Sequence, residues 1–185
     1  MNADHTRDEW LMAETALGKR ESLEVLIRRY ASPLLTFVER MVGDPNRSEE
    51  ILQEIFLTLW KKRQQYQFPR RFKAWLYAIA ANHCRTSFRG RPPAVLPFEE
   101  ETAPAAVGRD VSPVETAIST ETATLLATAV TQLPAQQRAV VVLRIWDGLS
   151  YAEIATILDR QEATVRAHMA HGLASLRKYL EPRLR

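Results

Sequence analysis

Basic and aromatic side chains gather between residues 60 and 91 of this 185-residue sequence. From Lys61 to Arg91, nine side chains are basic and none is acidic. A surface that follows single-stranded nucleic acid needs cations that pair with phosphates and aromatic rings that stack on bases. A solvated basic face around core aromatics has a similar composition, but the bias of nine to zero favours nucleic acid. The aromatic members are Trp60, Tyr66, Phe68, Phe72, Trp75, Tyr77 and Phe88.

One helix within this segment, predicted over residues 72–88, concentrates the candidate contacts. Trp75, Asn82 and Arg89 recur every seven residues, which places them on one helix face with Arg85 beside them. This face therefore offers a ring, an amide and two guanidinium groups to a strand of bases. The apolar side chains expected to face the other way, into the core, are Phe72, Leu76 and Ile79.

The preceding helix, predicted over residues 48–63, is apolar over more than half of its circumference. Ile51, Ile55 and Leu59 form the stripe that we expect in the domain core. An aromatic and polar edge such as the one beside this stripe often docks a partner protein. A helix packed on two sides within one domain would give the same pattern, so both interpretations stay open. The edge consists of Glu49, Gln53, Phe56 and Trp60.

A helix-turn-helix is predicted in the C-terminal part of the sequence. Ser150 and Glu153 have the spacing of a capping box, in which each side chain satisfies a backbone N–H of the other residue. The short helix that they open, over 151–158, is followed by a break at 159–161 and a longer helix over 164–180. Such a pair can place its second helix in the major groove of DNA.

The second helix of this pair carries polar side chains where a recognition helix needs them. A recognition helix reads base edges from its first turns, and its N-terminus lies favourably near phosphate. A helical hairpin with a solvated face is the alternative. The expected buried stripe is Val165, Met169, Leu173, Leu176 and Leu180. The candidate DNA contacts are Thr164, Arg166, His168 and His171.

Neither a catalytic site nor a metal site emerges from the sequence. His168 and His171 share a helix face, but no nearby Cys, Asp or Glu completes a set of metal ligands. The side chains of His83 and Cys84 point about 100° apart on a helix, so they cannot act as a base–thiol pair. Cys84 is the only cysteine, which excludes an intramolecular disulfide, and we interpret it as a small, partly buried residue. We therefore predict no enzymatic activity, no metal and no cofactor.

Helical periodicity extends over both halves of the chain, and no alternating strand pattern competes with it. We predict an all-α fold of two small helical domains joined by a Pro-rich flexible linker, because five of the ten prolines lie within residues 91–113. The lack of a long apolar run and the polar N-terminus predict a cytoplasmic protein without membrane insertion. Further helices are expected over 21–41, where Pro33 could introduce a kink or a break, and over 120–133 and 134–146.

Three motifs in the C-terminal half have a distinctive order and spacing, namely Leu133-Pro134-Ala135-Gln136-Gln137-Arg138, Gly148-Leu149-Ser150-Tyr151-Ala152-Glu153-Ile154-Ala155 and Thr164-Val165-Arg166. They resemble the promoter-binding domain of extracytoplasmic-function (ECF, group IV) RNA polymerase sigma factors, which belong to the sigma-70 family. In the N-terminal half, residues 48–60 look like the family's polymerase-binding helix, and residues 72–82 look like the element that opens the −10 promoter region. The resemblance implies sigma region 2 over 8–91, a linker over 92–116 and sigma region 4 over 117–182.

The same resemblance implies a bacterial sigma factor that binds core RNA polymerase and directs promoter-specific transcription initiation. The polymerase clamp would bind Glu49, Glu50, Gln53, Phe56 and Trp60. The opened −10 strand would bind Lys73, Trp75, Tyr77, Asn82, Arg85 and Arg89. With the C-terminal domain on the polymerase flap, the −35 duplex would bind Thr164, Arg166, His168 and His171. An anti-sigma factor is the regulator that the resemblance implies.

Two other classes of function fit parts of the pattern. A stand-alone helix-turn-helix regulator would bind DNA without polymerase, which leaves the aromatic and polar edge and the basic segment without a role. An adaptor that binds partners through helical grooves would bind no promoter, so the loss of Arg85 or Arg166 would change nothing in promoter binding. An enzyme has the least support, because the sequence has no pocket-like carboxylate pair, phosphate-binding glycine loop or nucleophile triad.

Overall fold

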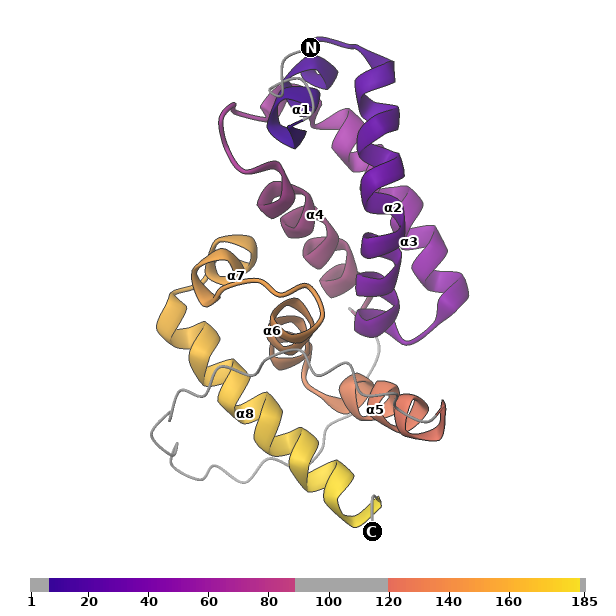
Figure 1. Cartoon of the computed structure of the whole chain (residues 1–185), viewed down its shortest axis with the longest axis vertical. Coiled ribbons are helices and arrows are strands. Elements are labelled where there is room, and N and C mark those ends of the chain that lie inside the picture. Colours follow the sequence, from indigo (N-terminus) through magenta and orange to yellow (C-terminus); the bar gives the residue numbers. More distant parts are fainter. Residues whose placement is uncertain (1–6, 89–119, 184–185) are drawn as a thin grey trace.

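The computed structural model describes residues 7–88 and 120–183, and all regular structure within these two ranges is helical, as predicted (Figure 1). The N-terminal domain contains α1 (Asp8–Ala16), α2 (Arg20–Val42), α3 (Pro45–Lys61), η2 (Arg63–Gln65) and α4 (Phe72–Ser87). The C-terminal domain contains α5 (Thr120–Gln132), α6 (Ala135–Ile145), α7 (Tyr151–Leu158), α8 (Glu162–Leu180) and η3 (Glu181–Arg183). The linker predicted over 92–116 lies outside the described residues.

Helix α2 continues through Pro33, so this proline does not divide it into two helices. Pro33 is exposed, and water can bind the carbonyl group that loses its intrahelical partner there. The helix ends at Gly43, whose φ of 75° lies in the left-handed region. Asp44 then caps α3, because its carboxylate accepts a hydrogen bond from the backbone N–H of Arg47 at 3.1 Å. The predicted core stripe of α3 is fully buried and consists of Ile51, Ile55 and Leu59.

The sequence analysis missed α1, which packs against α2. Its apolar residues Leu11 and Met12 are consecutive, so they give no three-and-four spacing, although both are buried. The carboxylate of Asp8 accepts hydrogen bonds from Tyr30 at 2.5 Å and from Arg29 at 2.7 Å. Polar contacts to α2 therefore fix the start of α1, and no periodic pattern announces them.

The helix-turn-helix forms as predicted from α7 and α8. The capping box is present: the hydroxyl of Ser150 accepts from the Glu153 N–H at 3.3 Å, and the Glu153 carboxylate accepts from the Ser150 N–H at 2.9 Å. Within α8, the prediction that Leu173 is buried is wrong, because 41% of its surface is exposed. The helix contacts α6 through Gly172 instead, where an added Cβ would lie 2.8 Å from Val141, so the seam passes beside Leu173.

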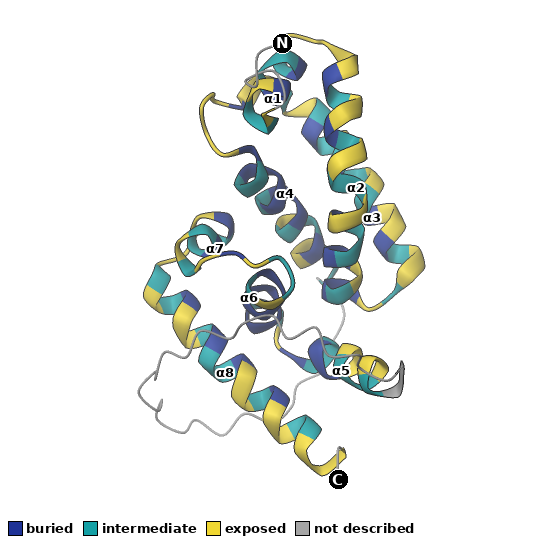
Figure 2. Cartoon of the chain, viewed as in Figure 1, coloured by how far each residue is buried: buried dark blue, intermediate teal, exposed yellow. Residues whose placement is uncertain are grey.

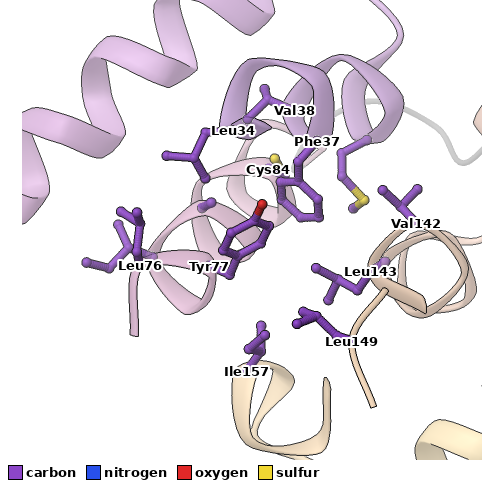
Figure 3. Packing of buried hydrophobic residues seen from close by; sticks show 14 of the residues in the cluster. Leu34, Phe37, Val38, Leu76, Tyr77, Cys84, Val142, Leu143, Leu149 and Ile157 are labelled. Carbon is purple, nitrogen blue, oxygen red and sulfur yellow. The ribbon is translucent and has the colours of Figure 1, made fainter. Parts of the chain in front are cut away.

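The two domains pack against each other through a continuous apolar core. Helix α4 lies against α7, and the C-terminal end of α2 lies against α5 and α6 (Figure 1). Buried residues concentrate on α4 and α6, near the middle of the molecule (Figure 2). Tyr77 of α4 lies between N-terminal residues such as Phe37 and C-terminal residues such as Leu149 and Ile157 (Figure 3). Most described residues of the candidate −10 surface therefore lie at or near a contact between domains.

Replacing Gly43 with Ala is expected to lower the free energy of unfolding by about 2 kcal/mol. The left-handed backbone costs about 1 kcal/mol with any Cβ, and here the new Cβ would also lie 2.8 Å from the Thr131 methyl group. Gly148→Ala is the matched control, because Gly148 has a φ of 65° with nothing within 4 Å of an added Cβ. Urea unfolding measures both variants, and equal losses would mean that the close approach to Thr131 costs nothing.

Candidate nucleic-acid and partner-binding sites

The outward edge of α3 is available for a partner in this structure. Glu49, Glu50 and Gln53 are exposed, whereas Phe56 and Trp60 are half-buried. The Arg63 guanidinium lies 4.0 Å from the centroid of the Trp60 ring, and Arg63 also donates a hydrogen bond to the Trp60 carbonyl at 2.8 Å. The ring is thereby held in place beside a cation. This edge can bury aromatic surface against a partner without disturbing the core stripe on the opposite side of α3.

A hydrogen-bonded cluster that the sequence analysis missed connects α3 to α4. The His83 ring contacts the Thr58 hydroxyl through Nε2 at 2.9 Å and the Glu54 carboxylate through Nδ1 at 3.2 Å. Glu54 and Thr58 are four residues apart on α3, a spacing that places both on one face. Because Asn82 directly precedes His83, this cluster fixes the orientation of the −10 helix relative to the polymerase-binding edge.

Cys84 is fully buried, more deeply than predicted. Burial raises the pKa of its thiol to about 12. The thiolate that nucleophilic chemistry requires is therefore scarce at neutral pH, which agrees with the interpretation of Cys84 as a packing residue.

The exposed part of α4 offers an amide and a guanidinium group to a ligand. Asn82 and Arg85 are exposed, and Arg85 donates a hydrogen bond to Asn82 Oδ1 at 2.7 Å. Lys73 is half-buried, with its ammonium group 5.6 Å from the centroid of the Tyr77 ring. Arg89 lies outside the described residues.

The prediction that Trp75 shares this open face is wrong for this structure, because only 8% of its surface is exposed. The chain segment between α3 and α4 folds back over the first turns of α4. It places Tyr66 5.3 Å from Trp75, measured between ring centroids. Tyr77 is also buried, and its hydroxyl donates to Asp147 of the C-terminal domain at 2.7 Å. A heptad spacing reports a shared helix face, but it does not report which loop or domain covers that face.

The basic and aromatic character predicted for α4 appears instead on the preceding loop. Phe68 exposes 56% of its surface and meets the ring of Trp10 edge-on. Arg70 and Arg71 follow it and are exposed as well. These side chains lie close to the start of α4 in sequence, so the cationic surface continues from the loop onto that helix.

Arg166 is the most exposed of the candidate −35 contacts with a charge. Its guanidinium pairs with Glu162 at 2.5 Å and stacks 4.4 Å from the centroid of the Tyr151 ring. His168 and His171 are half-buried on the same helix, as is Thr164 at its start. Burial lowers the pKa of His168, and the nearby His171 and Arg160 lower it further. The imidazole of His168 is thus neutral at physiological pH and offers one donor and one acceptor.

Within residues 7–88 and 120–183, no group of three or more His, Cys, Asp or Glu side chains could hold a metal ion. Among the helices of those ranges, none has both the length and the apolar character needed to cross a membrane.

Comparisons with known proteins match both halves of the chain. Residues 26–92 match the model for sigma-70 region 2, and residues 123–176 match the model for sigma-70 region 4. The RNA polymerase sigma-H factor of Pseudomonas aeruginosa is 27% identical, over 97% of this chain and 96% of that protein. The ECF RNA polymerase sigma factor SigW of Bacillus subtilis is 28% identical, over 88% of this chain and 91% of that protein.

Solved structures share the fold. CnrH, solved in complex with the cytosolic domain of CnrY, superimposes with a TM-score of 0.72 at 22% identity, covering 95% of this chain and 97% of that one. The sigma factor RpoE of Bartonella quintana, solved with the anti-sigma factor NepR, gives a TM-score of 0.65 at 20% identity, covering 85% of this chain and 96% of that one.

The region 2 match decides against a stand-alone helix-turn-helix regulator, because it accounts for the N-terminal domain that such a regulator leaves unexplained. The two regions occur in the predicted order, and the relatives align along nearly the whole chain. This chain belongs to the sigma-70 family of RNA polymerase sigma factors, in its extracytoplasmic-function group.

Proposed function

We propose that this chain binds core RNA polymerase in the bacterial cytoplasm and directs it to a restricted set of promoters. One observation carries the proposal: a single chain combines the polymerase-binding region 2 with the helix-turn-helix of region 4, in the order found in sigma factors. Sigma factors are initiation factors, and the polymerase performs the chemistry. The domain limits that we propose are 8–91 and 117–182, with a linker over 92–116.

The N-terminal domain would attach to the clamp of the polymerase largest subunit through the outward edge of α3. Carboxylates at one end of this edge and aromatic rings along it suit a basic, partly apolar partner surface. The C-terminal domain would sit on the polymerase flap. Two attachments on one large enzyme raise the effective concentration of each domain at its promoter element. The residues proposed for the clamp contact are Glu49, Glu50, Gln53, Phe56 and Trp60.

The −10 strand would bind along α4 after the duplex opens. Base stacking and pocket contacts are worth about 1–3 kcal/mol per base, enough to offset the lost pairing over a few bases. Asn82 and Arg85 would make the first contacts, because both are exposed. The remaining proposed contacts are Lys73, Trp75, Tyr77 and Arg89, of which Trp75 and Tyr77 require a change in their surroundings.

Replacing Arg166 with Ala is expected to weaken discrimination of the −35 element by about 1–3 kcal/mol, that is, roughly tenfold or more. Arg166 lies near the start of the recognition helix, where side chains reach base edges. Its exposed ion pair with Glu162 contributes little, so DNA can recruit the guanidinium at small cost. Competition between a cognate promoter and one with a scrambled −35 element measures this discrimination for the polymerase complex.

Arg177→Ala is the matched control for Arg166→Ala, because Arg177 is an exposed arginine near the other end of α8. Its loss should weaken both promoters alike. Equal changes in discrimination for the two variants would mean that Arg166 does not read the −35 element.

Reconstituted transcription tests the proposed function directly. Core polymerase is incubated with and without this chain on a genomic DNA library, and transcription start sites are mapped. We expect new start sites that share −10 and −35 sequences. Identical start sites in both reactions, or failure of polymerase to co-purify with the chain, would contradict the proposal. Because the fold is shared with a sigma factor solved together with an anti-sigma factor, we also propose such a regulator for this chain.

A further inference from the structure

The C-terminal domain covers the candidate promoter-binding surface of α4. Tyr77 donates its hydroxyl proton to Asp147, which lies in the turn between α6 and α7, at 2.7 Å. Asn82 and Arg85 line an interdomain cavity of about 260 Å³, and Asp159 and Arg160, from the turn after α7, line the same cavity. Promoter DNA and the α7 region would therefore have to occupy the same space on α4.

This contact is desolvated and specific at its centre. Only 1% of the Tyr77 surface is exposed, and Leu149 and Ile157 of the C-terminal domain pack around its ring (Figure 3). Burial raises the pKa of Asp147, whereas Tyr77, Lys73 and Arg40 act in the opposite direction. A buried tyrosine hydroxyl and a buried carboxylate each lose solvation, so their mutual hydrogen bond is costly to break unless water replaces it.

A second anchor joins the end of α2 to the C-terminal domain. The buried guanidinium of Arg138 donates to the carbonyl of Met41 on α2 and, at 2.9 Å, to the carbonyl of Leu133. The Arg40 guanidinium lies 4.8 Å from the centroid of the Trp146 ring. Both anchors hold the C-terminal domain in the position in which α7 covers α4.

We infer that the C-terminal domain is an intramolecular partner of α4 and that the Tyr77–Asp147 contact latches the chain in a closed state unable to bind the −10 strand. This inference rests on the proposed function of α4. The affinity of the free chain for DNA is then reduced by the fraction of molecules that are open. Attachment of the two domains to separate sites on polymerase would open the latch and expose Tyr77 and the rest of the α4 surface together.

The distance between the two domains reports the latch directly. Donor and acceptor dyes are placed at Glu24 on α2 and at Lys178 on α8, both exposed, in a full-length chain with Cys84→Ala. Single-molecule energy transfer then gives the fractions of closed and open molecules. Tyr77→Phe and Asp147→Ala should each raise the open-to-closed ratio about tenfold, because each removes a hydrogen bond to a charged group.

Tyr30→Phe is the matched control. Tyr30 also donates to a carboxylate, that of Asp8 at 2.5 Å, but this contact lies within the N-terminal domain. Its loss should leave the open fraction unchanged. Adding Tyr77→Phe to Asp147→Ala should have no further effect, because the shared contact is already lost.

An unchanged ratio in both latch variants, or fully additive effects of the two substitutions, would overturn the inference. The energy-transfer measurement needs neither polymerase nor DNA, so its outcome is independent of the proposed function. Conversely, a chain that closes as described but does not support transcription would leave the latch intact and contradict the proposed function.

Discussion

Asn82→Ala is expected to reduce open-complex formation by roughly tenfold to a hundredfold while affinity for core polymerase stays within about twofold, as follows from 1–3 kcal/mol per bound base. Asn82 is exposed on α4, and its amide can both donate to and accept from the edge of an unstacked base. It lies on a different helix from the proposed clamp contacts on α3. Permanganate reactivity of unpaired thymines measures opening, and fluorescence anisotropy measures polymerase affinity.

Asn46→Ala is the matched control for Asn82→Ala, because Asn46 is an exposed asparagine in the first turn of α3. We expect it to change neither opening nor affinity. If Asn82→Ala lowered opening and polymerase affinity equally, Asn82 would serve the shape of the domain. The hydrogen bond from Arg85 to Asn82 Oδ1 makes that outcome physically distinct, since Arg85→Ala would then reproduce both losses.

Local signals in the sequence predicted the helices and the helix-turn-helix. The capping box of Ser150 and Glu153 marked the start of α7, because its two hydrogen bonds depend only on residues three positions apart. The stripe from Ile51 to Leu59 predicted the buried side of α3 for a similar reason, namely that helix geometry repeats along a short segment. Such signals do not depend on distant parts of the chain.

Contacts between distant segments explain what the sequence analysis missed. Trp75 is buried because the loop that carries Tyr66 folds over it, and Tyr77 is buried because Asp147 and its neighbours, some seventy positions further along the chain, cover it. Neither partner is encoded in the heptad spacing of α4. The candidate −10 residues were thus assigned to the right helix, while the surroundings of two of them depend on tertiary packing.

Trp60→Ala is expected to lower the affinity for core polymerase by about thirtyfold or more, which corresponds to a loss of at least 2 kcal/mol. Its ring is half-buried on the outward edge of α3, where a partner can complete its burial. Removal also leaves the Arg63 guanidinium without the ring that it stacks on at 4.0 Å. Titration of labelled chain with core polymerase measures the affinity, and urea unfolding of the free chain measures stability.

Trp10→Ala distinguishes a polymerase contact from a general loss of aromatic surface. Trp10 belongs to the same domain and exposes 37% of its surface, but it lies on α1, away from the proposed clamp edge. We expect Trp10→Ala to leave polymerase affinity within about twofold. Equal losses of affinity for the two variants would argue against the clamp edge, because an interface concentrates its binding energy on a few central side chains. A loss of stability in Trp60→Ala as large as its loss of affinity would instead assign Trp60 to the domain core, and Phe56→Ala, on the same edge, would then decide whether α3 binds polymerase at all.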